Sequence, residues 1–135
     1  MSGFQWSATY ELGHEAMDAT HREFVALVAV LQRASDAELP AVLDDFVTHT
    51  EAHFAQELGW MQASGFPPLH CHRTEHDEVM AVVADVRRHV AAGDLALGRA
   101  LARELVPWFE THAATMDTAL ASWLKQTGWT TGRSD

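Results

Sequence analysis

Two short stretches of the sequence each place a pair of metal-ligand side chains four residues apart. Glu57 follows His53 at this spacing, and His76 follows His72. Four residues of an α-helix turn through roughly 400°, so the two side chains of a pair lie about 40° apart on one face. Imidazole is the commonest metal ligand in proteins, and carboxylates also bind metals. Each pair is therefore able to hold one side of a metal centre.

A third pair, His112 and Asp117, is separated by five residues instead of four. On a regular helix this separation turns roughly 500°, which leaves the side chains about 140° apart. Both can reach one centre only if the helix widens locally. The spacing therefore predicts a π-type turn between His112 and Asp117, a distortion found frequently at functional sites.

These residues are weak evidence when taken one at a time. A lone histidine on a helix is more often a surface or hydrogen-bonded core residue than a ligand, and 9 histidines in 135 residues produce such pairs by chance. The combination is more informative, because these residues fall at helical spacing on apolar helix faces. Buried charges of this kind need a metal, or one another, to offset desolvation. The predicted metal ligands are His21, His53, Glu57, His72, His76, His112 and Asp117.

The remaining histidines have no place in these motifs. They are His14, His49, His70 and His89. His49 precedes His53 by four residues, and we interpret it as a partly exposed residue or as one that supports His53. Cys71, beside His72, points to a different helix face and is interpreted as a buried bystander.

Four segments have apolar residues at the three-and-four spacing of an amphipathic helix. They span about 17–31, 42–61, 69–90 and 97–124. Ser35 or Asp36 is suited to cap the second helix, and Gly65 with the two prolines after it is suited to end it. Each of the four helices would carry at least one candidate ligand.

Pro107 lies inside the fourth segment. Proline removes a backbone donor and clashes with the preceding turn, so we expect a kink or a helix that restarts there. A loop at Pro107 is the weaker interpretation, because the apolar spacing continues on both sides.

The expected fold is all-α, an up-down-up-down antiparallel four-helix bundle, whose core is a natural place for a metal site. We expect one domain over residues 1–135, with an N-terminal arm over about 1–16 and a frayed polar tail over about 127–135.

Composition excludes several classes of partner. The chain has 9 Lys and Arg against 19 Asp and Glu, a formal net charge of −10, which disfavours nucleic acid and anionic membrane surfaces. Its single cysteine forms no intramolecular disulfide, and the start of the sequence lacks the pattern of a signal peptide. The longest apolar run, 24–31, is too short to span a bilayer. These features predict a cytoplasmic protein.

The candidate ligands, taken in order along the chain, resemble those of the hemerythrin family, and in particular its single-domain bacterial members, the bacteriohemerythrins. The resemblance covers nearly the whole chain and extends to several residues outside the ligand set. These further positions are Trp6, Asp18, Phe54, Met61, Gly65, Phe66, Pro67 and Trp108.

This resemblance implies a site in the bundle core with two non-haem iron ions (Fe²⁺/Fe³⁺) and a bridging oxo or hydroxo group. By family analogy one iron takes His72, His76 and His112, and the other takes His21 and His53. Glu57 and Asp117 bridge the two. The second iron then has one ligand fewer, which leaves an open position for dioxygen. Imidazole is a ligand suited to iron, and an open position is typical of reactive metal sites.

The expected function is reversible dioxygen binding, as in an oxygen carrier, store or delivery protein. Dioxygen is the expected small-molecule partner, the sequence names no protein partner, and no catalytic residues are expected. Ferritin-like di-iron oxidases normally use four carboxylates with Glu-x-x-His spacing, whereas this chain offers two carboxylates and five histidines. The alternatives are an oxygen or redox sensor that acts through a separate partner, and a protein with mild peroxidase or nitric-oxide chemistry.

Four residues are expected to line the ligand pocket if the family geometry holds, namely Phe54, Trp108, Phe109 and Ala113. The family usually has leucine at the position of Phe109 and isoleucine at that of Ala113. One exchange adds bulk and the other removes it, so the pocket changes shape more than volume. Reversible oxygen binding needs a dry pocket, and we therefore expect a changed rate of autoxidation.

Overall fold

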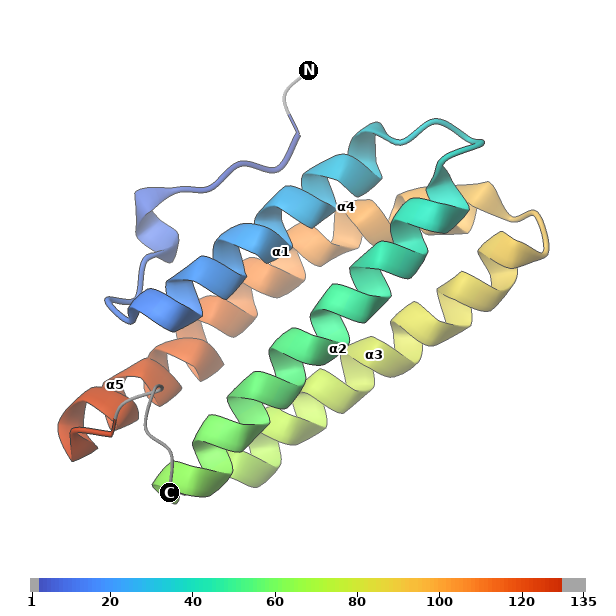
Figure 1. Ribbon diagram of the computed structural model, residues 1–135. Helices are drawn as coiled ribbons and strands as arrows, with labels where there is room; N and C mark the ends of the chain where they lie inside the picture. The colour runs from blue at the N-terminus through green and yellow to red at the C-terminus, as the bar shows by residue number, and fades with distance from the viewer. Residues whose placement is uncertain (1–2, 130–135) are drawn as a thin grey trace.

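The computed structural model describes residues 3–129, which form an antiparallel bundle of four long helices (Figure 1). Each helix packs against the next one along the chain, and the last returns to pack against the first. The long helices are α1 (Glu15–Arg33), α2 (Leu39–Ser64), α3 (Leu69–Ala91) and α4 (Leu95–His112). A π-helical turn, η2 (Ala113–Asp117), and α5 (Thr118–Thr127) extend α4, and a short 3-10 turn, η1 (Ala8–Tyr10), precedes α1. The all-α, up-down-up-down fold expected from the sequence is confirmed.

Local sequence explains where α2 begins and ends. The Ser35 N–H donates to Glu38 Oε1 (2.9 Å), and the Glu38 N–H donates to Ser35 Oγ (3.2 Å), which together form a capping box. The predicted cap at Ser35 is present, although the regular helix starts only at Leu39, after a turn over 36–38. At the other end Gly65 adopts a left-handed conformation (φ 68°) that favours glycine and stops the helix.

Helix α4 continues through Pro107 without a loop and without restarting there. Pro107 is exposed, so its ring lies on the outer face of the bundle. The departure from regular α-helix comes later, at η2, where the spacing of His112 and Asp117 predicted it.

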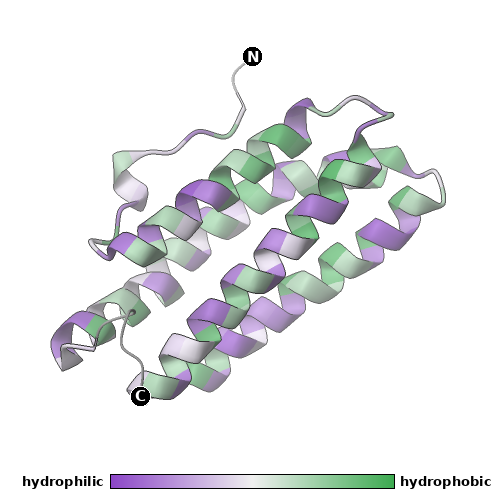
Figure 2. Cartoon of the chain, in the orientation of Figure 1, coloured by the Kyte–Doolittle hydropathy of each residue, from purple (hydrophilic) through white to green (hydrophobic). Residues whose placement is uncertain are grey.

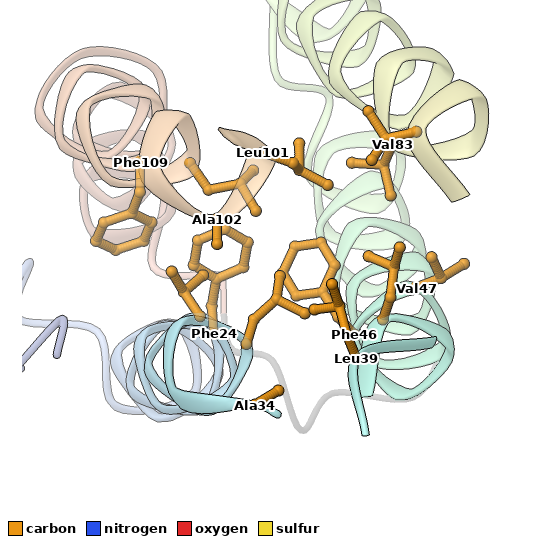
Figure 3. Close-up of a cluster of buried hydrophobic side chains, with 14 of the residues drawn as sticks. Phe24, Ala34, Leu39, Phe46, Val47, Val83, Leu101, Ala102 and Phe109 are labelled. Atoms are coloured by element: carbon orange, nitrogen blue, oxygen red, sulfur yellow. The ribbon is translucent and has the colours of Figure 1, made fainter. Parts of the chain in front are cut away.

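Apolar side chains form two buried clusters at different heights in the bundle. The larger cluster fills the half of the bundle in which α1 ends and α2 begins, and its side chains point inward from all four long helices (Figure 3). The smaller cluster lies around α5 and the end of α2; its buried members are Met17, Trp60, Met61, Phe66, Leu120, Ala121 and Leu124. Each long helix carries both hydrophilic and hydrophobic residues, as an amphipathic helix does (Figure 2).

The candidate ligands lie between these two clusters. On α1, His21 follows Met17 of the smaller cluster and precedes Phe24 of the larger one. On α2 the order is reversed, because that helix runs the other way: Phe46 belongs to the larger cluster and Met61 to the smaller. A polar layer is therefore enclosed between two apolar layers.

The segment before α1 runs along the outside of the bundle (Figure 1). The Phe4 N–H donates to Gln32 Oε1 (2.7 Å), and the Asp18 carboxylate accepts the N–H groups of Leu12 (2.9 Å) and Gly13 (3.2 Å). These bonds hold the segment, which we call the arm, against the bundle up to the start of α1 at Glu15. The bounds expected for the arm stay a prediction. The expected tail lies outside the described residues from position 130 onward.

No helix within residues 3–129 is long and apolar enough to cross a membrane.

Candidate metal centre

The seven predicted ligands come together in the centre of the bundle. All are buried; His53, at 8% exposure, is the most exposed of them. They come from α1 (His21), α2 (His53 and Glu57), α3 (His72 and His76), the end of α4 (His112) and η2 (Asp117). Their side-chain nitrogen and oxygen atoms converge, so the spacing argument selected residues that do meet in space.

Three histidines form one side of this site, and we call His72, His76 and His112 the three-histidine group. The Nε2 atoms of His76 and His112 lie 3.0 Å apart. Asp117 Oδ1 lies 3.1 Å from His72 Nε2 and 3.3 Å from His112 Nε2. Glu57 Oε1 lies 3.3 Å from His72 Nε2 and 3.4 Å from His76 Nε2. Three imidazole nitrogens therefore face one oxygen of each carboxylate.

The other two histidines, His21 and His53, form the two-histidine group on the opposite side. Glu57 Oε2 lies 2.8 Å from His53 Nε2 and 3.4 Å from His21 Nε2. Asp117 Oδ2 lies 3.1 Å from His21 Nε2. Each carboxylate thus turns one oxygen to the three-histidine group and the other to the two-histidine group.

The π turn brings Asp117 into this arrangement. Residues 113–117 form η2, as the five-residue spacing predicted, and the wider turn carries Asp117 round to the face that His112 occupies. The Thr118 hydroxyl donates to the Ala113 carbonyl (2.8 Å) and adds a side-chain bond to the turn. The π turn therefore explains why Asp117, five residues after His112, reaches the same site.

Opposite charges dominate the electrostatics of the site. Burial alone would lower the pKa of both His21 and His72, but the carboxylates of Asp117 and Glu57 raise these pKa values to about 10 and about 9. Burial would raise the pKa of Glu57, yet the surrounding histidines hold it well below its usual range. Burial, with a contribution from neighbouring histidines, lowers the pKa of His76 to about 3. The carboxylates are therefore ionised and His76 is neutral.

Several atoms at the centre lack hydrogen-bond partners although they are fully enclosed. Glu57 Oε1, Asp117 Oδ1 and His72 Nε2 are all of this kind, because their short contacts are not aligned as hydrogen bonds. Leaving a buried polar atom unpaired costs about 1–3 kcal/mol. A cation at this point would satisfy all three atoms, and imidazole with carboxylate is a donor set suited to iron. The residues present therefore fit a metal site.

Comparison with known proteins gives the same answer. Residues 12–124 match the family model described as the hemerythrin HHE cation binding domain. The chain belongs to the hemerythrin family. It is 49% identical to a bacteriohemerythrin of Ralstonia nicotianae over 95% of this chain and 93% of that protein. It is 28% identical to a bacteriohemerythrin of Stenotrophomonas maltophilia (89% and 80% covered) and 25% identical to a hemerythrin of Sipunculus nudus (84% and 87%). Dioxygen binding is the function of this family.

Aromatic side chains surround the ligands of this hemerythrin domain. Phe54 stacks on His76, with ring centroids 3.7 Å apart at an interplanar angle of 4°, and Trp108 stacks on the ring of His112 (4.6 Å, 12°). Phe109 meets the His21 ring edge-on (5.3 Å, 90°). Ala113, the fourth residue predicted at the pocket, is buried beside His112. All four residues lie beside the site, and their role as a ligand pocket stays a prediction.

The structure adds one residue that the sequence did not reveal. Glu75 Oε1 lies 2.6 Å from His112 Nδ1, on the side of the ring that faces away from the other ligands. Glu75 precedes His76 directly and so belongs to no ligand-spaced pair on its own helix. Its partner is on α4, and sequence spacing within α3 carries no signal for a contact between helices.

The remaining histidines lie outside the cluster. His14 is the N-cap of α1 and accepts the Met17 N–H at Nδ1 (3.2 Å), while His49, His70 and His89 are exposed. The interpretation of Cys71 as a buried residue is wrong, because it is exposed. Its neighbour His72 points into the core. Adjacent residues of a helix are about 100° apart around the axis, so the Cys71 side chain faces outward.

Proposed function

We propose that this hemerythrin-family protein binds dioxygen reversibly at a carboxylate-bridged pair of non-haem iron ions. One observation carries the proposal: both carboxylates, Glu57 and Asp117, divide their two oxygens between two separate groups of histidines. A carboxylate placed in this way suits a bridge between two metal ions. Iron supplies the electrons for reversible dioxygen binding and takes them back on release.

The ligand assignment follows from this division. His72, His76 and His112 would hold one iron, while His21 and His53 would hold the other. Glu57 and Asp117 would be shared by both. The two-histidine side has one protein ligand fewer, so this is the side where an external ligand has room.

The protein residues would also set the character of the site. When they bind metal, the five imidazoles would be uncharged, so the protein would bring two negative charges where ferritin-like oxidases bring four. Less negative charge favours the reduced iron pair. The two apolar clusters and the aromatic rings of Phe54, Trp108 and Phe109 limit the access of water. A dry site protects bound oxygen from the side reactions that make oxidation irreversible. We therefore propose a carrier, storage or delivery role and assign no catalytic residue.

Spectroscopy on purified protein tests this function. We expect about two iron ions per chain, as in other di-iron bundles. After anaerobic reduction, admission of air should produce near-ultraviolet and visible charge-transfer bands that fade when oxygen is removed. Bands that never reverse would favour an oxidase or a sensor, and zinc as the only metal from iron-replete cells would contradict the proposal.

Removal of either bridging residue should abolish binding of the iron pair. We expect Glu57→Ala and Asp117→Ala each to lose both irons, because each carboxylate would contact both metals, and metal analysis after desalting measures the loss. Glu51→Ala is the matched control, since Glu51 lies on the same helix but is exposed. Retention of two irons in Glu57→Ala would show that this carboxylate does not bridge.

A further inference from the structure

Glu75 connects the candidate centre to the outer surface of the bundle. It lies on α3 with one-third of its side chain exposed (33%), in the groove between α3 and α4 that Glu78 and Glu104 also line. From this position its Oε1 reaches across to His112 Nδ1 at 2.6 Å. Its neighbour in sequence, His76, points into the site, whereas Glu75 approaches the site from behind His112.

This contact determines which nitrogen of His112 carries a proton. An ionised carboxylate is only an acceptor, so the hydrogen bond requires Nδ1 to donate. In a neutral ring the proton on Nδ1 leaves Nε2 with a free lone pair. Nε2 is the atom that faces His76 (3.0 Å) and Asp117 (3.3 Å) in the three-histidine group. The bond to Glu75 therefore presents the ligand atom in the form that binds a metal.

Among the five clustered histidines of the described chain, only His112 has a hydrogen-bond partner at Nδ1. The Nδ1 atoms of His21 and His72 are buried without one. His112 is also held on its ring face, because Trp108 stacks on it. The hydrogen bond to Glu75 therefore fixes the rotation of the His112 ring in its own plane, and stacking on Trp108 fixes the tilt of that plane. The other four clustered histidines lack this combination of contacts.

We infer that Glu75 is a positioning residue for the metal centre: it fixes the tautomer and orientation of His112 and raises the electron-donating power of its Nε2. The inference deepens the proposed function and rests on the metal assignment made there. Carboxylates that accept a hydrogen bond from a ligating imidazole commonly act in this way, and their loss weakens metal binding. A stronger donor in the three-histidine group stabilises the oxidised state of the metal it binds.

Titration with Co²⁺ alone tests the positioning role without depending on oxygen chemistry. Iron-free protein is titrated anaerobically while the visible d–d bands report coordination. We expect Glu75→Ala to weaken Co²⁺ binding at one of two sites about 10–100-fold. Glu75→Gln keeps an oxygen that accepts the same hydrogen bond and should recover most of the affinity. Glu78→Ala removes an equal charge from the same groove, but the hydrogen bond to His112 Nδ1 comes from Glu75, so this variant should leave the affinity unchanged.

A second measurement separates this role from general stabilisation. Thermal unfolding of the iron-free variants shows whether the fold is intact. If Glu75→Ala unfolds at a lower temperature than wild type, Glu75→Gln is compared with wild type instead. In the iron-loaded protein, Glu75→Gln should make the reduction potential of the centre more positive, because a neutral acceptor strengthens the ligand less than a carboxylate does.

Two results would overturn the inference. One is equal loss of Co²⁺ affinity in Glu75→Ala and Glu78→Ala, which would show an effect of surface charge alone. The other is a Glu75→Gln centre with unchanged potential together with a Glu75→Ala protein of unchanged affinity. Neither depends on reversible oxygen binding, so failure of the proposed carrier function and failure of this inference give different results.

Discussion

Phe109 joins the candidate centre to the N-terminal arm. Its ring stacks on Phe24 (5.2 Å, 20°), meets the His21 ring edge-on, and packs edge-on against Phe4 (5.9 Å) and Tyr10 (5.4 Å) from the arm. The sequence indicated a bulky residue beside the pocket. The structure shows that this bulk fills the space between the two-histidine group and the arm, on the side where we propose that oxygen binds.

Phe109→Leu should therefore increase the rate of irreversible oxidation of the oxygenated protein. The smaller side chain leaves space beside His21, water gains access, and the free energy of unfolding falls by about 1–3 kcal/mol. Appearance of the oxidised form is followed by absorbance after oxygenation. Phe46→Leu is the matched control, because Phe46 is as deeply buried in the larger cluster and its ring packs against Phe24 instead of a candidate ligand. Equal oxidation rates in Phe109→Leu and wild type would remove the claim.

A single carboxylate of helix α1 accepts two hydrogen bonds from the arm. Asp18 is buried at 6% exposure, and both its oxygens accept backbone N–H groups from the arm. Asp18 lies in the first turn of α1, where an acidic residue is favourable in any case. The structure gives it the additional role of fastening the arm that covers Phe109.

Asp18→Ala should release the arm and lower the free energy of unfolding by about 2 kcal/mol, the scale of hydrogen bonds to a charged group. Asp18→Asn, which keeps one acceptor oxygen, should lose less. Urea denaturation measures the stability, and limited proteolysis before α1 measures release of the arm. Glu15→Ala changes an exposed acid in the same first turn and serves as the control. An arm equally protected in Asp18→Ala would contradict this role.

Two glycines inside helices have opposite surroundings. A Cβ at Gly98 of α4 would lie 2.8 Å from Val90 Cγ2 and 3.1 Å from Leu39 Cδ2, whereas nothing lies within 4 Å of a Cβ at Gly59 of α2. Gly98 therefore permits the close approach of α4 to the end of α3 and the start of α2. Gly59 has no such role.

Alanine at these two positions should change stability in opposite directions. Gly59→Ala should raise the free energy of unfolding by about 1 kcal/mol, the difference in helix propensity. Gly98→Ala has the same gain in helix propensity but overpacks a buried contact, so the free energy of unfolding should fall by about 1 kcal/mol. Chemical denaturation of both variants measures these changes. If both substitutions stabilise the protein, the contact between α3 and α4 accommodates the added methyl group, and the prediction for Gly98 is wrong.

The whole molecule encloses a charged layer between two apolar clusters, and this arrangement controls how stability depends on pH. His21 and His72 have pKa values raised to about 10 and about 9 by Asp117 and Glu57. Since the ordinary value is 6.5, the stabilisation from these groups is fully present below that pH and is lost as pH rises through 9 to 10.

Iron-free protein should therefore lose a few kcal/mol of stability between pH 7 and about 10. Iron-loaded protein should change little over that range, because a metal-bound imidazole nitrogen carries no proton. Urea midpoints at several pH values provide the measurement. If the stability of iron-free protein does not change between pH 7 and about 10, Asp117 and Glu57 do not raise the pKa values of His21 and His72.

Helical periodicity made much of this protein predictable from local patterns. The four helices, six of the seven clustered residues and the π turn at His112–Asp117 follow from residue spacing, because the angle between neighbouring side chains on one helix is set by local geometry. The cap at Ser35 is local in the same way. Cys71 shows the limit: its direction away from His72 was predictable, but its exposure depends on whether another helix covers that face.

Contacts between helices were decided only by the tertiary structure. The division of the Glu57 and Asp117 oxygens between two histidine groups depends on how far each helix is rotated and shifted against the others. The bond from Glu75 to His112 and the fastening of the arm by Asp18 have the same origin. The sequence alone determines which face of each helix is turned inward. The packing of the two apolar clusters determines which atoms on those faces meet.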